Sequence, residues 1–113
     1  MKQFISYSDF EKIDIRIGTI ISAYKNNKLL KPSIVLKIDF GKDIGIKKSS
    51  AQLSKNYDSK KLINKQIAAV INFHPKQIGN LISDVLVLGF PDDNNDPILI
   101  SPDKKISDGG RLY

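Results

Sequence analysis

The feature that most constrains the fold is an alternation of isoleucine with polar or small residues near the start of the chain. Over residues 13–18 the letters IDIRIG place isoleucine at every second position. A period of two is typical of a β-strand with one buried face, whereas a helix repeats every 3.6 residues. We therefore expect a long strand whose isoleucines, Ile21 included, face a core. Gly18 within it predicts the sharp bend or bulge that a closed barrel needs.

Later segments show related strand patterns. The run DVLVLGF is apolar on both faces, as expected for a central or interface strand. Bounded by polar and glycine-containing turns, such patterns predict strands over residues 34–40, 44–52, 66–73, 84–90 and 98–100, with a polar loop over 25–33.

Two short helices are expected beside the strands. Ser8 and Glu11 have the spacing of a capping box, and Asp58 is a suitable N-cap for a helix that ends near Ile63. Three strands, a short helix and two further strands form the pattern of the OB-fold. We predict an all-β protein, a five-stranded Greek-key barrel with short helices and extensions at both ends. A chain of 113 residues fits one such domain, over residues 1–113.

The charge balance favours an anionic partner. Eighteen basic and twelve acidic residues give a formal net charge of +6, a sign that suits nucleic acid. A lysine-rich composition inherited from the genome explains the same excess. Only Arg16 and Arg111 are arginines, so bidentate reading of bases by arginine is not expected. The lysines would act as point charges towards phosphates.

The sequence contains no recognisable catalytic or metal-binding set. There is no cysteine, and the single His74 has no second histidine with which to share a metal. Ser49 and Ser50 lack an evident base beside them. The acidic run 92–96 resembles the start of a calcium loop, but Pro97 replaces the required glycine, so a hairpin tip is expected. We expect a protein that is not an enzyme and that uses no metal or cofactor.

The N-terminal sequence predicts the location of the protein. Residues 1–13 hold no apolar run of the length that a signal peptide requires, and no segment is apolar over the about 20 residues of a spanning helix. We expect a cytoplasmic protein that does not insert into membranes.

Basic and polar residues gather on two neighbouring segments of the predicted barrel. Lysines there could contact phosphates, and the hydroxyl and amide groups could bond to sugars or base edges. A solvated barrel surface is the equally simple alternative. The residues are Lys47, Lys48, Ser50 and Gln52 on the third strand, and Asn72, His74 and Lys76 at the end of the fourth.

The aromatic residues are few and scattered along the chain, mostly where strands would bury them. Proteins that bind single strands without sequence preference need clustered, exposed aromatic side chains. Recognition of a structured RNA backbone is therefore expected over generic single-strand binding.

The blocks DIRIGTI, KIDFG, GIKKSSAQL and INFHPKQIGNLISDVLVLG occur in this order along the chain. In content and order they resemble the CsaA family, described as secretion-related chaperones with a tRNA-binding domain. More remotely, the chain resembles the tRNA-binding modules of methionyl- and phenylalanyl-tRNA synthetases. The resemblance implies an OB-fold barrel over roughly residues 13–90. It also implies a homodimer formed through extensions 1–12 and 91–113.

The resemblance further implies that the loop after the fourth strand contacts tRNA. Asn72, Pro75 and Ser83 match the signature of the wider family, and Lys76 would contact a phosphate. The chain departs from that signature at Asn80, where the family has glycine, and at Val85-Leu86, which replace a Gly-Met pair. His74 and Lys76 also stand where CsaA-like proteins often have Pro and Arg.

A second function follows from the family's description as chaperones. An apolar groove near the dimer interface would bind unfolded or export-bound peptides. The residues proposed for it are Phe4, Leu81, Ile82 and Phe90, which the dimer core would explain equally well.

Overall fold

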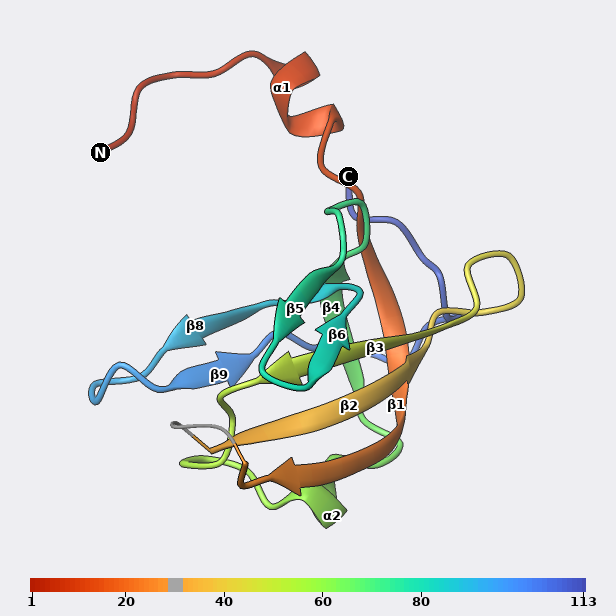
Figure 1. Ribbon diagram of the computed structural model, residues 1–113. Helices are drawn as coiled ribbons and strands as arrows, with labels where there is room; N and C mark the ends of the chain where they lie inside the picture. Colours follow the sequence, from red (N-terminus) through yellow and green to blue (C-terminus); the bar gives the residue numbers. More distant parts are fainter. Residues whose placement is uncertain (29–31) are drawn as a thin grey trace.

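The computed structural model describes residues 1–28 and 32–113 and shows a curled antiparallel sheet with two hairpins (Figure 1). The sheet consists of β1 (Ile15–Asn26), β2 (Ser33–Asp39), β3 (Ile46–Ala51), β4 (Gln66–Val70) and β7 (Leu86–Val87). Their order across the sheet is β3-β2-β1-β4-β7. The other elements are α1 (Tyr7–Glu11), α2 (Ser59–Leu62), the hairpin of β5 (Lys76–Ile78) and β6 (Leu81–Ser83), and the hairpin of β8 (Gly89–Pro91) and β9 (Pro97–Leu99).

The sheet closes into a barrel through the segment 83–87. At one end of this segment the Asp84 amide donates to the Lys48 carbonyl at 2.7 Å, and the Lys48 amide donates to Asp84 Oδ2 at 3.0 Å. At the other end Val87 pairs with Ala69 of β4. The segment thus joins the two edges of the sheet, which confirms the predicted all-β class and OB-type barrel.

The core lies inside this barrel. Ile34, Leu36 and Ile38 of β2 are fully buried, as their alternation predicts. Leu62 of α2 closes the core from one end, and the helix begins at the predicted cap, where Asp58 accepts a hydrogen bond from the Lys60 amide. Leu99 belongs to the same cluster. The barrel range of 13–90 expected from the sequence therefore stops short of one core residue.

The predicted inward face of β1 is wrong. Gly18 and Ile20 are buried, whereas Ile13 and Ile21 are each 42% exposed. The two-residue period defines two faces but does not say which one the other strands will cover. The bulge, marked by a register shift between Ile20 and Ser22, also lies beyond Gly18.

Other boundaries differ from the predictions. The capping box of α1 is formed by Ser6 and Asp9, not by Ser8 and Glu11. The polar loop begins later than expected, since β1 continues to Asn26; residues 29–31 of that loop lie outside the described residues. The predicted third strand, 44–52, is shorter at both ends.

The predicted strands 66–73 and 84–90 also need correction. The first ends at Val70, which leaves Phe73 57% exposed instead of aligned with the core. The second divides into β7 and β8 and leaves Leu86 and Phe90 exposed, so it is not a central strand. The β5–β6 hairpin lies where the sequence indicated only a loop.

The acidic run after β8 forms the tip of a hairpin, as predicted. Asp92 Oδ1 accepts hydrogen bonds from the amides of Asn94 and Asp96, each at 2.9 Å. The bond from the Asp96 amide is the largest cause that lowers the pKa of Asp92 below its ordinary value. The bonds from the Asn56 side chain and the Asn94 amide act in the same direction. The carboxylate therefore stabilises a turn.

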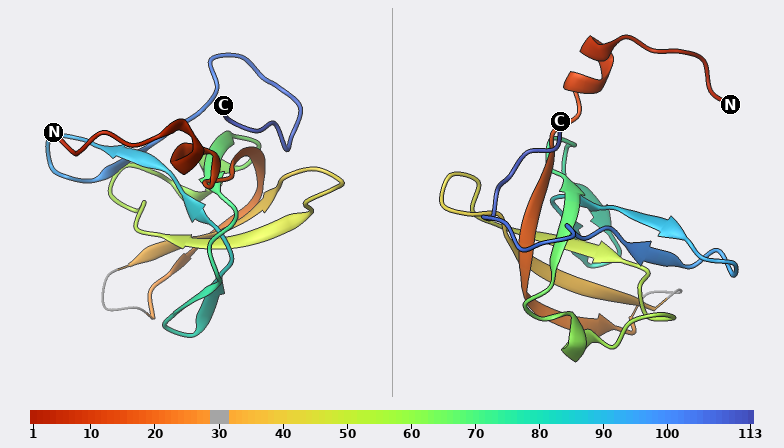
Figure 2. Two further views of the ribbon diagram at one scale, coloured as in Figure 1. Left: turned by 90° about the horizontal axis from the view of Figure 1, so that it is seen from above. Right: turned by 180° about the vertical axis from the view of Figure 1, so that it is seen from behind.

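The two ends of the chain behave differently. The C-terminal segment runs along β1, where the Gly109 amide donates to the Ile17 carbonyl and the Ile17 amide donates to the Gly110 carbonyl. Residues 1–6 and α1 stand away from the barrel, as the views in Figure 2 show, and α1 buries none of its residues. In the described part of the chain, no helix has the length and apolar character needed to cross a membrane.

Gly18 is required by packing, which generates a stability prediction. A Cβ at this position would lie 2.5 Å from Ile38 Cγ2 and 2.8 Å from Phe40 Cδ1. We expect Gly18→Ala to lower the free energy of unfolding by about 1–3 kcal/mol, the usual cost of overpacking a core. Urea denaturation measures it.

Gly45→Asn is the matched control for this change. Nothing lies within 4 Å of a Cβ at Gly45, and asparagine tolerates its positive φ of 87°. We expect a much smaller loss there. Equal stabilities of Gly18→Ala and the unaltered protein would contradict the packing argument.

Candidate functional site

A groove of about 650 Å³ lies between β3 and the segments on either side of the β5–β6 hairpin. Its walls are largely apolar, with Leu53, Val85 and Leu99 buried at the side of the core. Phe73 and Leu86 also line the groove, and they are 57% and 50% exposed, respectively. The volume falls in the range of roughly 300–1,000 Å³ that is usual for ligand sites.

Many residues predicted from the sequence converge on this groove. The lining includes Ser50, Gln52, His74, Lys76 and Ser83. The remaining predicted residues adjoin lining residues along the chain. They are Lys47 and Lys48, which precede Ser49 on β3, and Asn72 and Pro75, which flank Phe73 and His74.

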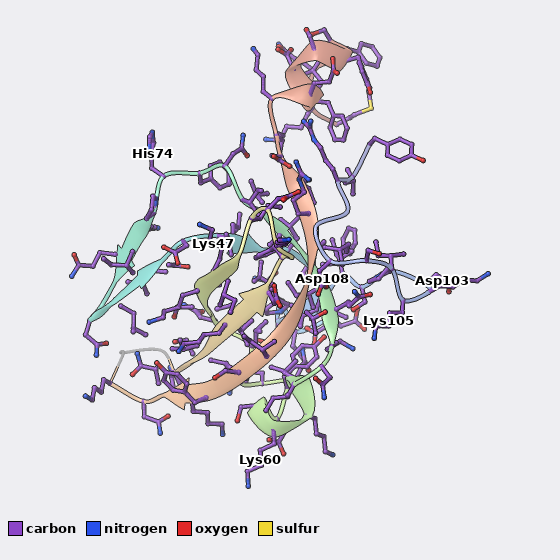
Figure 3. All side chains as sticks on the ribbon, turned by 90° about the vertical axis from the view of Figure 1, so that its right-hand side faces the viewer. Lys47, Lys60, His74, Asp103, Lys105 and Asp108 are labelled. Carbon is purple, nitrogen blue, oxygen red and sulfur yellow. The ribbon has the colours of Figure 1, made fainter. Side chains whose placement is uncertain are left out.

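Figure 3 shows how the labelled charged residues are distributed. Lys47 and His74 lie on one side of the molecule, with His74 at the outer tip of its loop. Lys105 lies on the other side, and Lys60 lies at the end that carries α2. The labelled Lys60 and Lys105 therefore lie away from the side that carries Lys47 and His74.

Positive charge is concentrated on the β2–β3 part of this side. Lys37 lies directly opposite Lys48 in the strand register, an arrangement of like charges that destabilises a sheet. Within the described residues the ion pairs are Lys12–Asp9, Arg16–Asp14 and Arg111–Asp14, so none involves these two lysines. Sequence reasoning missed Lys37 because its position opposite Lys48 depends on a register that is known only from the folded sheet.

Asn72 has a structural task. Its Oδ1 accepts a hydrogen bond from the Asp14 amide at 2.9 Å, and its Nδ2 donates to the Lys12 carbonyl at 2.7 Å. The side chain thereby ties the start of β1 to the loop that carries Phe73 and His74. Its predicted contact with RNA stays a prediction, but both ends of the amide are already bonded to backbone.

The serines of the predicted site also bond within the protein. Ser83 Oγ accepts from the Ser50 amide and donates to the Val85 carbonyl, each at 3.2 Å. The hydroxyls of Ser50 and Ser33 lie 3.1 Å apart. These contacts support barrel closure beside the groove.

Both arginines anchor the C-terminal segment. Arg16 pairs with Asp14 at 2.6 Å and donates to the Gly109 carbonyl, while Arg111 donates to the Glu11 carbonyl. The hydrogen bond that Arg16 donates to the Asp14 carboxylate raises the pKa of Arg16. The arginines are thus engaged away from the groove.

The residues suggested for peptide binding do not meet in the groove. Phe4 lies in the N-terminal arm, Leu81 and Ile82 lie on β6, and Phe90 lies on β8. None of the four lines the groove. Among residues 1–28 and 32–113, no group of three or more His, Cys, Asp or Glu side chains is placed to hold a metal ion.

Comparison with known proteins identifies relatives of the whole chain. A family model described as "Putative tRNA binding domain" matches residues 15–111. The crystal structure of CsaA chaperone protein from Picrophilus torridus is 47% identical and covers 97% of this chain and all of that one, with a TM-score of 0.89. The chaperone CsaA structure from Bacillus anthracis is 39% identical over 98% of this chain and all of that one, with a TM-score of 0.92.

Another relative is a much longer protein. The methionine–tRNA ligase of Methanococcoides burtonii is 37% identical over 115 aligned residues, which span 99% of this chain. The chain corresponds to 16% of the length of that ligase.

The bonds of Asn72 generate a second prediction. Asn72→Ala removes two hydrogen bonds, each worth roughly 0.5–1.5 kcal/mol, so we expect a loss of about 1–3 kcal/mol in the free energy of unfolding. Hydrogen exchange at the Asp14 amide should accelerate as well. Asn94→Ala, at the exposed hairpin tip, is the control and should leave that amide unchanged. Unaltered exchange in Asn72→Ala would contradict the tie.

Proposed function

Because the chain belongs to the family of tRNA-binding domains, we propose that it binds tRNA with the side of the barrel that carries the groove. The lysines around the groove would hold the phosphate backbone, and the fixed curvature of β2 and β3 would select RNA shape. Such contacts give affinity with little sequence preference.

The observation that carries this proposal is the juxtaposition of Lys37 with Lys48, the residue next to the groove-lining Ser49 on β3. A like-charge pair across a sheet is unfavourable in the free protein, and a bound phosphate removes the repulsion. Lys47 precedes Lys48 on β3, on the other face of the strand, and Lys76 lies at the start of β5. These four lysines would supply the positive charge that holds an anionic backbone.

The proposal covers binding alone and no catalysis. The matching family is described as a binding domain, and the activity of the methionine–tRNA ligases is not transferred to a chain about a sixth of their length. We propose a cytoplasmic binding protein without enzymatic activity, a location that suits a tRNA partner.

We also propose that two copies associate through the N-terminal arm and the C-terminal end. Phe4, Ile5 and Tyr7 are between 67% and 92% exposed, and Tyr113 is fully exposed. A hollow of about 200 Å³ with a mixed polar and apolar lining lies between α1 and the chain's last residues. Exposed apolar side chains of this density are typical of an interface, and a second copy of the same arm would cover them.

A chaperone role is the alternative function. It is supported by the likeness to structures described as CsaA chaperones. The scattered positions of Phe4, Leu81, Ile82 and Phe90 supply no single peptide groove within one copy, so tRNA binding is the function that the geometry supports best.

The tRNA proposal predicts a salt-dependent affinity. With about four phosphate contacts, log K should fall against log salt with a slope of about −3, taking 0.7 per contact. The double variant Lys47→Ala/Lys48→Ala should flatten the slope by about 1.4, and Lys76→Ala by about 0.7. Fluorescence anisotropy of a labelled tRNA at several salt concentrations measures both effects.

The matched control is Lys60→Ala/Lys61→Ala on α2, which removes the same charge at another end of the molecule (Figure 3). It should leave the slope within error. Equal effects of the two double variants would mean that net charge alone drives binding. Affinity independent of salt in the unaltered protein would overturn the proposal.

The dimer proposal predicts the effect of a charge in the arm. Phe4→Asp should weaken association at least about 10-fold, because burying a phenylalanine contributes about 1.5–3 kcal/mol. Sedimentation velocity over a range of concentrations measures it. Ile63→Asp is the control, since Ile63 is 43% exposed beside α2, at the opposite end of the molecule from α1 (Figure 1). A monomeric unaltered protein at all concentrations would contradict the proposal.

A further inference from the structure

We propose that the groove receives one unstacked nucleobase of the bound RNA, while the lysines around it hold the flanking phosphates. This inference rests on the proposed tRNA binding and specifies the ligand of the same site. It means that the protein selects RNA with at least one base free to leave its stack, in addition to a backbone of suitable shape.

The aromatic side chain for stacking is Phe73. It lines the groove and is 57% exposed, although an exposed phenylalanine contributes little to stability. Its neighbours fix its position: Asn72 bonds to the backbone of Lys12 and Asp14, and Pro75 has a restricted φ. Little ordering cost therefore remains when a base stacks on the ring.

The groove wall offers polar groups for a base edge. Ser49 is 2% exposed and lines the groove. Its hydroxyl would bond to the edge of the inserted base.

The negative charge of Asp84 favours entry of the base, and not of the phosphate, into the groove. Asp84 lines the groove, and its carboxylate accepts a hydrogen bond from the Lys48 amide at 3.0 Å. A negative charge beside apolar walls repels a phosphate but accepts hydrogen bonds from the N–H groups of a base. The phosphates would stay with Lys47, Lys48 and Lys76, and the base would enter.

An apolar peptide side chain would also suit the walls. The lysines beside the groove distinguish the two occupants, because a peptide without acidic residues gains nothing from them, whereas each nucleotide carries a phosphate next to its base. Charge complementarity therefore favours the nucleotide.

The decisive variants change only the aromatic ring. Phe73→Leu keeps an apolar side chain but loses the stacking face, and we expect it to raise the Kd for labelled tRNA at least about 5-fold. The salt slope should not change, because no phosphate contact is lost. Phe73→Tyr keeps an aromatic ring and should bind tRNA with about the affinity of the unaltered protein. Phe90→Leu, which alters a 68% exposed phenylalanine outside the groove, is the matched control.

The outcomes separate this inference from the proposed function. Salt-dependent tRNA binding that Phe73→Leu leaves unchanged would overturn base insertion and leave tRNA binding standing. If Phe73→Tyr lost as much affinity for tRNA as Phe73→Leu, base insertion would also be overturned. Absence of salt-dependent binding in the unaltered protein would remove the proposed function itself.

A direct measurement uses small probes on the unaltered protein. In ¹H–¹⁵N correlation spectra, adenosine 5′-monophosphate should shift the amide signals of Ser49, Phe73 and Val85, whereas ribose 5-phosphate should shift only signals near the lysines. Identical shifts from the two probes would overturn the inference. Groove shifts produced by the uncharged peptide acetyl-Phe-Leu-amide, and not by the nucleotide, would overturn it in favour of a peptide site.

Discussion

The groove depends on the hydrogen bonds that close the barrel between β3 and the segment 83–87. The Asp84 and Lys48 backbones bond directly, and Ser83 bonds to the Ser50 amide. These contacts hold one groove wall against the other and fix Lys48 close to the carboxylate of Asp84. Fold and candidate site are therefore inseparable here, since a change that opens the barrel at this point also removes the groove.

A second set of contacts positions the loop above the groove from the opposite edge. Asn72 bonds to the chain just before β1, and Asp14 in turn pairs with Arg16 and Arg111. The loop, the start of β1 and the C-terminal segment thus form one connected network. Its members are widely separated in sequence, so the network stabilises the barrel edge and holds Phe73 at the groove at the same time.

The barrel could be predicted from the sequence, because period-two patterns and turn residues are local signals. The alternation in β2 identified Ile34, Leu36 and Ile38 correctly. The inward face of β1 could not be predicted, because it depends on Ile38 and Phe40 filling the space beside Gly18. Charge and resemblance pointed to residues within 47–52 and 72–76, several of which line the groove. Lys37, the bonds of Asn72 and the exposure of Phe73 required the cross-strand register and the early end of β4.

The structure also separates the roles of the basic residues, which composition alone could not do. The two arginines form ion pairs and backbone bonds that anchor the C-terminal segment. Lysines predominate beside the groove, and Lys37 and Lys48 face each other without an acidic partner among the described residues. A compositional excess of lysine explains many cations on a surface, but it does not explain why two lie opposite each other at a cost in stability. Point charges without a planar fork attract phosphates and read no base pattern. Such a surface favours RNA shape and backbone, and leaves any preference among bases to the groove.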